Sequence, residues 1–151
     1  MEKWKAIELD MQIYKERDGI FILSEIPDLF QVIDDCVADI NMILGNRFVT
    51  FIRKKCEDLK KEIQNASKVV DAWVEMQRQW IYLENIFTSP ELRKSLSRDA
   101  LDFDGVNKFF TGMCAKAAKM TSISRFVKQP NVSFENIDNQ NKILERVEKA
   151  L

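Results

Sequence analysis

An unbroken helical stretch constrains the fold of this chain more than any other feature. From Arg47 to Phe87 the sequence contains neither glycine nor proline, and its apolar residues recur at spacings of four and three, the heptad pattern of a helical seam. A helix of about forty residues would be roughly 60 Å long at ~1.5 Å per residue. Such a helix cannot bury its face against a small core, so we predict long helical neighbours and an elongated shape. The seam residues are Val69, Trp73, Met76, Trp80, Leu83 and Phe87.

Helices are also predicted on both sides of this stretch. Pro27 suits a first helical turn, and an apolar face then runs to Leu44, where Gly45 is expected to end the helix in the left-handed conformation. After Phe87, "TSPEL" predicts a new start, with Ser89 as cap and Pro90 in the first turn. We predict helices to about residue 96, over about 98–120 and over about 134–151, with a loop between the last two. Gly105 and Gly112 within the second of these helices suggest close packing against a neighbour.

The N-terminal segment has a different period. Apolar residues alternate from Ile7 to Ile13, "KERDG" at 15–19 is typical of a turn, and Ile20–Leu23 is apolar again, so a short β-hairpin is predicted. The predicted fold is therefore mainly α: an elongated antiparallel helical bundle with a small N-terminal β-hairpin. We assign residues 1–26 to the hairpin segment and 27–151 to the bundle. The sequence stops within a helical pattern, so we expect a single fragment of a longer chain.

The composition argues against several kinds of chemistry. There is no histidine, and Cys36, Cys56 and Cys114 lie far apart, which indicates buried, reduced thiols. A phosphate-binding glycine loop and a nucleophile elbow are both absent from the sequence. Asp34 and Asp35 are adjacent and would point in different directions on a helix, so a cation site there is disfavoured. We expect no catalytic residue, no cofactor, no metal and no enzymatic activity.

Binding to nucleic acid or to a membrane is not expected either. The formal net charge is -1, and basic residues do not form a one-sided stripe. No apolar run approaches the ~20 residues that span a bilayer. We therefore expect a soluble protein of the cytoplasm or cytoskeleton.

The concentration of aromatic residues in "DAWVEMQRQWIYLENIF", residues 71–87, allows three interpretations. The first is packing in the bundle core, since Trp73 and Trp80 both occupy seam positions. The second is a docking surface for a partner, because tryptophan and arginine are frequent interface anchors. The third, an enzymatic site, is the least favoured.

This stretch resembles the linker region of dynein heavy chains. The match reads W-x-x-x-Q-R-x-W-x-Y-L-E-x-I-F, and "SPELRKSL", "DGIFIL" and "ILGNRFV" are similar to further family segments, with Ser97 standing where the family has proline. The short connection "FTSPELRKSL" and the segment "GNRF" are more similar to axonemal than to cytoplasmic heavy chains. The matching motif residues are Trp73, Gln77, Arg78, Trp80, Tyr82, Leu83, Glu84, Ile86 and Phe87.

The resemblance implies a function in movement along microtubules. The family's linker is a helical rod that lies across a ring of AAA+ modules and bends during the ATP cycle. The chain would then be a non-catalytic, force-transmitting lever, and its partners would be that ring and the remaining linker of the same heavy chain, with other dynein subunits as indirect partners. It would be located in the cytoskeleton, in the axoneme of a cilium or flagellum. The alternative is a free-standing helical scaffold or adaptor that binds a partner helix through an aromatic groove.

Overall fold

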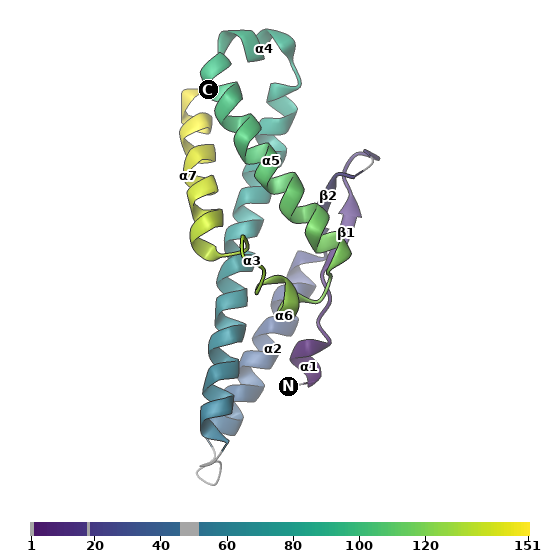
Figure 1. Ribbon diagram of the computed structural model, residues 1–151, viewed down its shortest axis with the longest axis vertical. Coiled ribbons are helices and arrows are strands. Elements are labelled where there is room, and N and C mark those ends of the chain that lie inside the picture. The colour runs from purple at the N-terminus through teal and green to yellow at the C-terminus, as the bar shows by residue number, and fades with distance from the viewer. Residues whose placement is uncertain (1, 18, 46–51) are drawn as a thin grey trace.

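Helices dominate the computed structural model, which describes residues 2–17, 19–45 and 52–151 (Figure 1). Their order is α1 Glu2–Lys5, β1 Asp10–Ile13, β2 Phe21–Ser24, α2 Ile26–Leu44, α3 Arg53–Phe87, α4 Pro90–Ser95, α5 Ser97–Lys119, α6 Ile123–Phe126 and α7 Phe134–Ala150. The predicted class, a mainly α protein with an N-terminal hairpin, is confirmed.

The spine of the molecule is α3, which is 35 residues long. Figure 1 shows α2 running back along one half of α3, while α5 and α7 lie along the other half, so the shape is elongated as predicted. The seam explains this arrangement, because each of its residues is at most 3% exposed and needs a neighbour along the whole helix. The predicted start of the long helix at Arg47 lies outside the described residues, and α3 begins at Arg53.

The hairpin is antiparallel, and its register pairs Asp10 with Ser24 and Ile13 with Phe21. Lys15, Glu16 and Gly19 have positive φ in the connecting turn, which confirms the turn predicted at 15–19 apart from Asp18, which is not described. The alternation that predicted a strand from Ile7 extends beyond β1. Ile7 and Leu9 are buried ahead of it, where the Leu9 N–H donates to the Thr121 carbonyl oxygen at 2.7 Å.

Two helix-end predictions are wrong in detail. Gly45 has φ -73 and is right-handed, because its N–H donates back to the Asn41 and Ile43 carbonyl oxygens and ends α2 in a tightened turn. Ser89 precedes α4 as expected, and Pro90 occupies the first turn. Ser89 is the N-cap residue, and its carbonyl oxygen accepts the first helical hydrogen bond from the Arg93 N–H at 3.1 Å, but its side chain makes no capping hydrogen bond.

The packing predicted at the α5 glycines is also wrong. A β-carbon placed on Gly105 or Gly112 would meet nothing within 4 Å. Two short helices were not predicted: α1, which carries the buried Trp4, and α6, which lies within the predicted loop. Helices of one turn give no periodic signal in a sequence, and their packing stabilises them.

Candidate functional site

The aromatic rings of α3 connect it to three other elements. Trp73 packs on Phe126 of α6 with ring centroids 5.3 Å apart, and Phe87 stacks on Phe103 of α5 at 5.2 Å. Large side chains are needed here because α3 has to reach neighbours that approach from different directions. These rings therefore lie in the core, as the first interpretation of the stretch predicts.

Trp80 is the centre of this arrangement, and it is 1% exposed. Its ring stacks on Phe110 of α5 at 4.6 Å and meets the edge of Tyr14, from the hairpin, at 5.1 Å. Its indole N–H donates to Asn107 Oδ1 at 2.7 Å, so the single polar atom of the buried ring is satisfied. One side chain thus joins α3, α5 and the hairpin.

Gln77 lies one turn before Trp80 and holds the backbone of β2. Its Oε1 accepts from the Leu23 N–H at 2.7 Å, and its Nε2 donates to the Leu23 carbonyl oxygen at 2.9 Å. Both groups point away from β1, and a β-strand edge carries such groups unpaired unless something covers it. The carboxamide therefore takes the place of a neighbouring strand on a two-stranded sheet.

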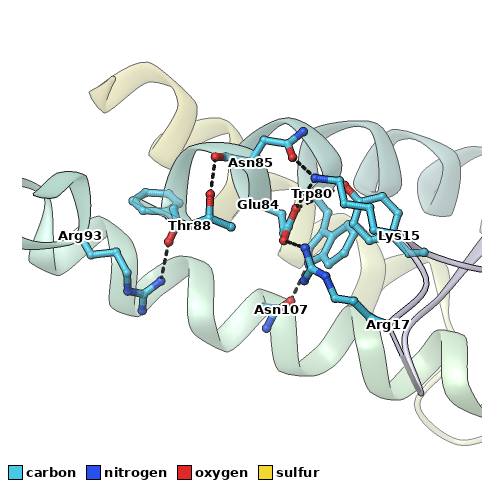
Figure 2. A network of polar contacts seen from close by, with 10 residues as sticks. Lys15, Arg17, Trp80, Glu84, Asn85, Thr88, Arg93 and Asn107 are labelled. Carbon is cyan, nitrogen blue, oxygen red and sulfur yellow. Dashed lines mark hydrogen bonds and ion pairs between the residues drawn. The ribbon is translucent and has the colours of Figure 1, made fainter. Parts of the chain in front are cut away.

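Glu84 lies one turn after Trp80 and binds the tip of the hairpin (Figure 2). Glu84 is buried, with 5% of its surface exposed. Its carboxylate accepts a hydrogen bond from the Tyr14 hydroxyl at 3.2 Å and forms ion pairs with Arg17 and, at 3.7 Å, with Lys15. A buried carboxylate is costly without such partners. We call Gln77, Trp80 and Glu84 the hairpin dock, because they fix the hairpin to one face of α3.

All of residues 1–151 match the family described as dynein heavy chain, N-terminal region 2. The chain belongs to the dynein heavy chain family. It is 24% identical to human dynein axonemal heavy chain 6 over 99% of its length, and 29% identical to human dynein axonemal heavy chain 10 over its full length. It is 28% identical to mouse dynein axonemal heavy chain 2 over 98% of its length. The chain spans only 4%, 3% and 3% of these relatives.

The residues of the dynein-like motif divide into three groups. Trp73, Leu83 and Phe87 belong to the buried seam, and Ile86 is half-buried beside them. The second group is the hairpin dock, Gln77, Trp80 and Glu84. Arg78 and Tyr82 are exposed, the latter by 50%. Arg78 pairs with Glu75 at 2.7 Å, and this hydrogen bond lowers the pKa of the Glu75 carboxyl. Most side chains of the motif are therefore buried in the core of this dynein heavy chain segment, and two of them face solvent.

The cysteines of this dynein segment are free thiols. Burial raises the pKa of Cys114 to about 12 and also raises the pKa of Cys36, so neither supplies a thiolate at neutral pH. Cys56 is half-buried. The expectation of buried thiols is therefore confirmed for two of the three cysteines.

Within the described ranges, no three histidine, cysteine, aspartate or glutamate side chains lie close enough to hold a metal ion. Asp34 and Asp35, the disfavoured cation site, are exposed on α2. Of the helices that are described, none is long and apolar enough to cross a membrane.

Sequence reasoning missed several polar side chains that lie in or beside the core of this dynein segment. The Trp4 indole N–H donates to Glu62 Oε2 at 2.7 Å, and Asn141 Nδ2 of α7 donates to the Ala72 carbonyl oxygen at 3.0 Å. Gln79 is 2% exposed on α3. The positions of Gln79 and Asn141 on their helices give only a weak indication that they are buried, because polar residues on a helix are exposed in most cases.

Proposed function

We propose that this chain is a force-transmitting linker element of a dynein motor heavy chain. The hairpin dock carries the proposal. A lever transmits force only if its parts move together. The dock joins α3 to the hairpin through residue pairs that are 54 to 70 positions apart in the sequence. The contacts to the hairpin combine an edge-on aromatic pair, two hydrogen bonds from the Gln77 carboxamide and a half-buried ion pair between Arg17 and Glu84.

The dimensions of α3 support the same proposal. A helix of 35 residues is about 50 Å long, and α2, α5 and α7 support it along its length. Close-packed interiors resist compression and transmit strain, so a load applied at one end of α3 reaches the other end. In this proposal the aromatic stretch acts as an internal brace.

The lever would couple the ATP cycle of an AAA+ ring elsewhere in the heavy chain to movement along microtubules. Its partners are then that ring and the rest of the linker, and other dynein subunits are indirect partners. Relatives of this chain are named axonemal dynein heavy chains. We extend that location to this chain and place it in the cytoplasm and cytoskeleton, in the axoneme of a cilium or flagellum.

We further propose that the segment has no catalytic site of its own. The purified chain should therefore not hydrolyse ATP, because its sequence has no phosphate-binding glycine loop and no histidine to serve as a base. Phosphate release is measured against a control without protein. Turnover that follows the chain through purification and is lost on changing one acidic residue contradicts this part of the proposal.

The lever is tested in a heavy chain that carries this segment, with Gln77→Leu and Glu84→Leu introduced together. These changes release the hairpin but leave the seam in place, so we expect ATP turnover to persist while microtubule gliding slows. Lys61→Ala, an exposed position on the same helix, is the matched control and should change neither rate. Unchanged gliding in the double variant contradicts the lever, and an equal fall in both rates points to loss of the ring's activity instead.

The alternative function, a scaffold with an open aromatic groove, receives no support from the rings of the seam. Trp73 and Trp80 are each 1% exposed and are covered by elements of the chain itself. A partner helix could reach them only after α5, α6 or the hairpin had moved away.

A further inference from the structure

We propose that Ser89 is a phosphorylation site for a proline-directed serine/threonine kinase, and that its phosphate binds Arg93. The inference goes beyond the linker proposal and does not depend on it. Of the three prolines, only Pro90 follows a hydroxyl-bearing residue. Proline-directed kinases select proline after the acceptor because a residue with an N–H would leave that group unpaired in their substrate groove.

The backbone at Ser89 already has a shape that a kinase can bind. Its φ is -79 and its ψ is 119, an extended conformation that the following proline favours. The Ser89 side chain makes no capping hydrogen bond. The neighbouring Thr88 differs, because its hydroxyl donates to the Asn85 carbonyl oxygen at 2.8 Å. Thr88 is exposed and Ser89 is half-buried, but the Thr88 hydroxyl is held by a hydrogen bond and only Ser89 is followed by a proline.

The segment around Ser89 is weakly packed. Residues 88–99, which include all of α4, contain no buried side chain, and Pro90 and Glu91 are exposed. Segments with few buried contacts open locally at low cost in free energy. A kinase can therefore draw this connection into its active site while the seam of α3, which ends at Phe87, stays folded.

Arg93 is the cation that we expect to bind the phosphate. Its backbone N–H donates to the Ser89 carbonyl oxygen at 3.1 Å, so it lies one turn further on. Its guanidinium contacts the Phe87 carbonyl oxygen at 3.4 Å, close to the chain just before Ser89 (Figure 2). The same guanidinium pairs with Asp104 of α5 at 2.5 Å. A phosphate carries more charge than a carboxylate and pairs strongly with arginine. We infer that it draws Arg93 away from Asp104 and loosens α4 from α5.

The chemical step is a phosphoryl transfer from ATP. The bond between the γ-phosphorus and the oxygen that bridges it to the β-phosphorus breaks, and a bond forms between that phosphorus and Ser89 Oγ. ADP leaves with the bonding pair, and the hydroxyl proton passes to the aspartate base of the kinase. No other reactant is needed.

The first test treats the folded chain with ATP and a purified kinase of the MAP kinase class. Intact mass and peptide mapping should find one phosphate at Ser89. Ser89→Ala and Pro90→Ala should abolish it, while Thr88→Ala should retain it. A folded chain that takes up no phosphate, or takes it up only elsewhere, overturns the proposal, and it does so even if a peptide of residues 84–97 is phosphorylated.

The second test concerns Arg93. Phosphorus NMR follows the second ionisation of the phosphoserine, whose ordinary pKa is about 6, in the phosphorylated chain and in its Arg93→Gln variant. A guanidinium within bonding distance favours the dianion, so the pKa should be lower with Arg93 present. Equal pKa values in the two chains would show that the phosphate does not bind Arg93 and would overturn that half of the proposal.

Discussion

Replacing Trp80 with alanine should lower the free energy of unfolding by ~3–5 kcal/mol, the range for truncating a buried tryptophan. The ring is 1% exposed, stacks on Phe110 and meets the edge of Tyr14, so its removal leaves a cavity where three elements join. It also leaves Asn107 without its indole donor. Urea denaturation, followed by circular dichroism, measures the change. Typical domains have only ~5–15 kcal/mol in total, so the variant should be largely unfolded at modest denaturant.

Lys61→Ala is the control for Trp80→Ala. Lys61 is exposed on the same helix, so its replacement should stay within about 0.5 kcal/mol of the wild type. If Trp80→Ala melts at the same urea concentration as this control, the ring does not brace the bundle. The aromatic stretch would then belong to an interface with another part of the heavy chain.

Trp4→Ala should lower the free energy of unfolding by about 3 kcal/mol. Trp4 is 1% exposed and donates to Glu62 of α3 at 2.7 Å, so it ties the four-residue helix α1 to the spine. The loss should fall near the lower end for a tryptophan, because Trp4 lines an open apolar hollow of about 300 Å³ and the surroundings can relax into the space that the ring leaves.

Urea melts also test Trp4, with the exposed Lys5→Ala as the matched control in the same helix. Trp4→Phe should recover most of the loss, since it restores the apolar ring but not the hydrogen bond to Glu62. A Trp4→Ala variant as stable as the Lys5→Ala control would mean that α1 contributes nothing to the folded state.

The parts of the fold that repeat along the sequence could be predicted from it. The seam of α3 was predicted because a heptad pattern over several turns has few other physical explanations. The hairpin was predicted because its alternation is followed by "KERDG", in which Gly19 is free to take positive φ. The structure confirms this turn, with φ 79 at Gly19. Both signals are local, and residues close in sequence determine them.

The parts that depend on distant residues could not be predicted. The sequence places Gln77 and Glu84 in the motif, but it does not reveal that their partners are Leu23 and Arg17. Their pairing arises from tertiary packing, and a periodic pattern in the sequence carries no information about it. Trp4 was missed for the same reason: its helix of one turn is stable only against α2, α3 and α6.

The claim that the motif face of α3 holds the hairpin is tested most directly at the amide of Leu23. This N–H donates to the side chain of Gln77, not to another strand, at 2.7 Å. Amide hydrogen exchange should therefore find it protected in the wild type. In Gln77→Leu the loss of the acceptor should speed its exchange about tenfold or more, while the core amide of Phe110 keeps its rate.

Arg78→Ala is the matched control, because Arg78 is the exposed neighbour of Gln77 in the same motif. It should leave the exchange rate of the Leu23 amide unchanged. A Leu23 amide that exchanges freely in the wild type, or equally slowly in the wild type and Gln77→Leu, would contradict the hairpin dock and the rigid lever built on it.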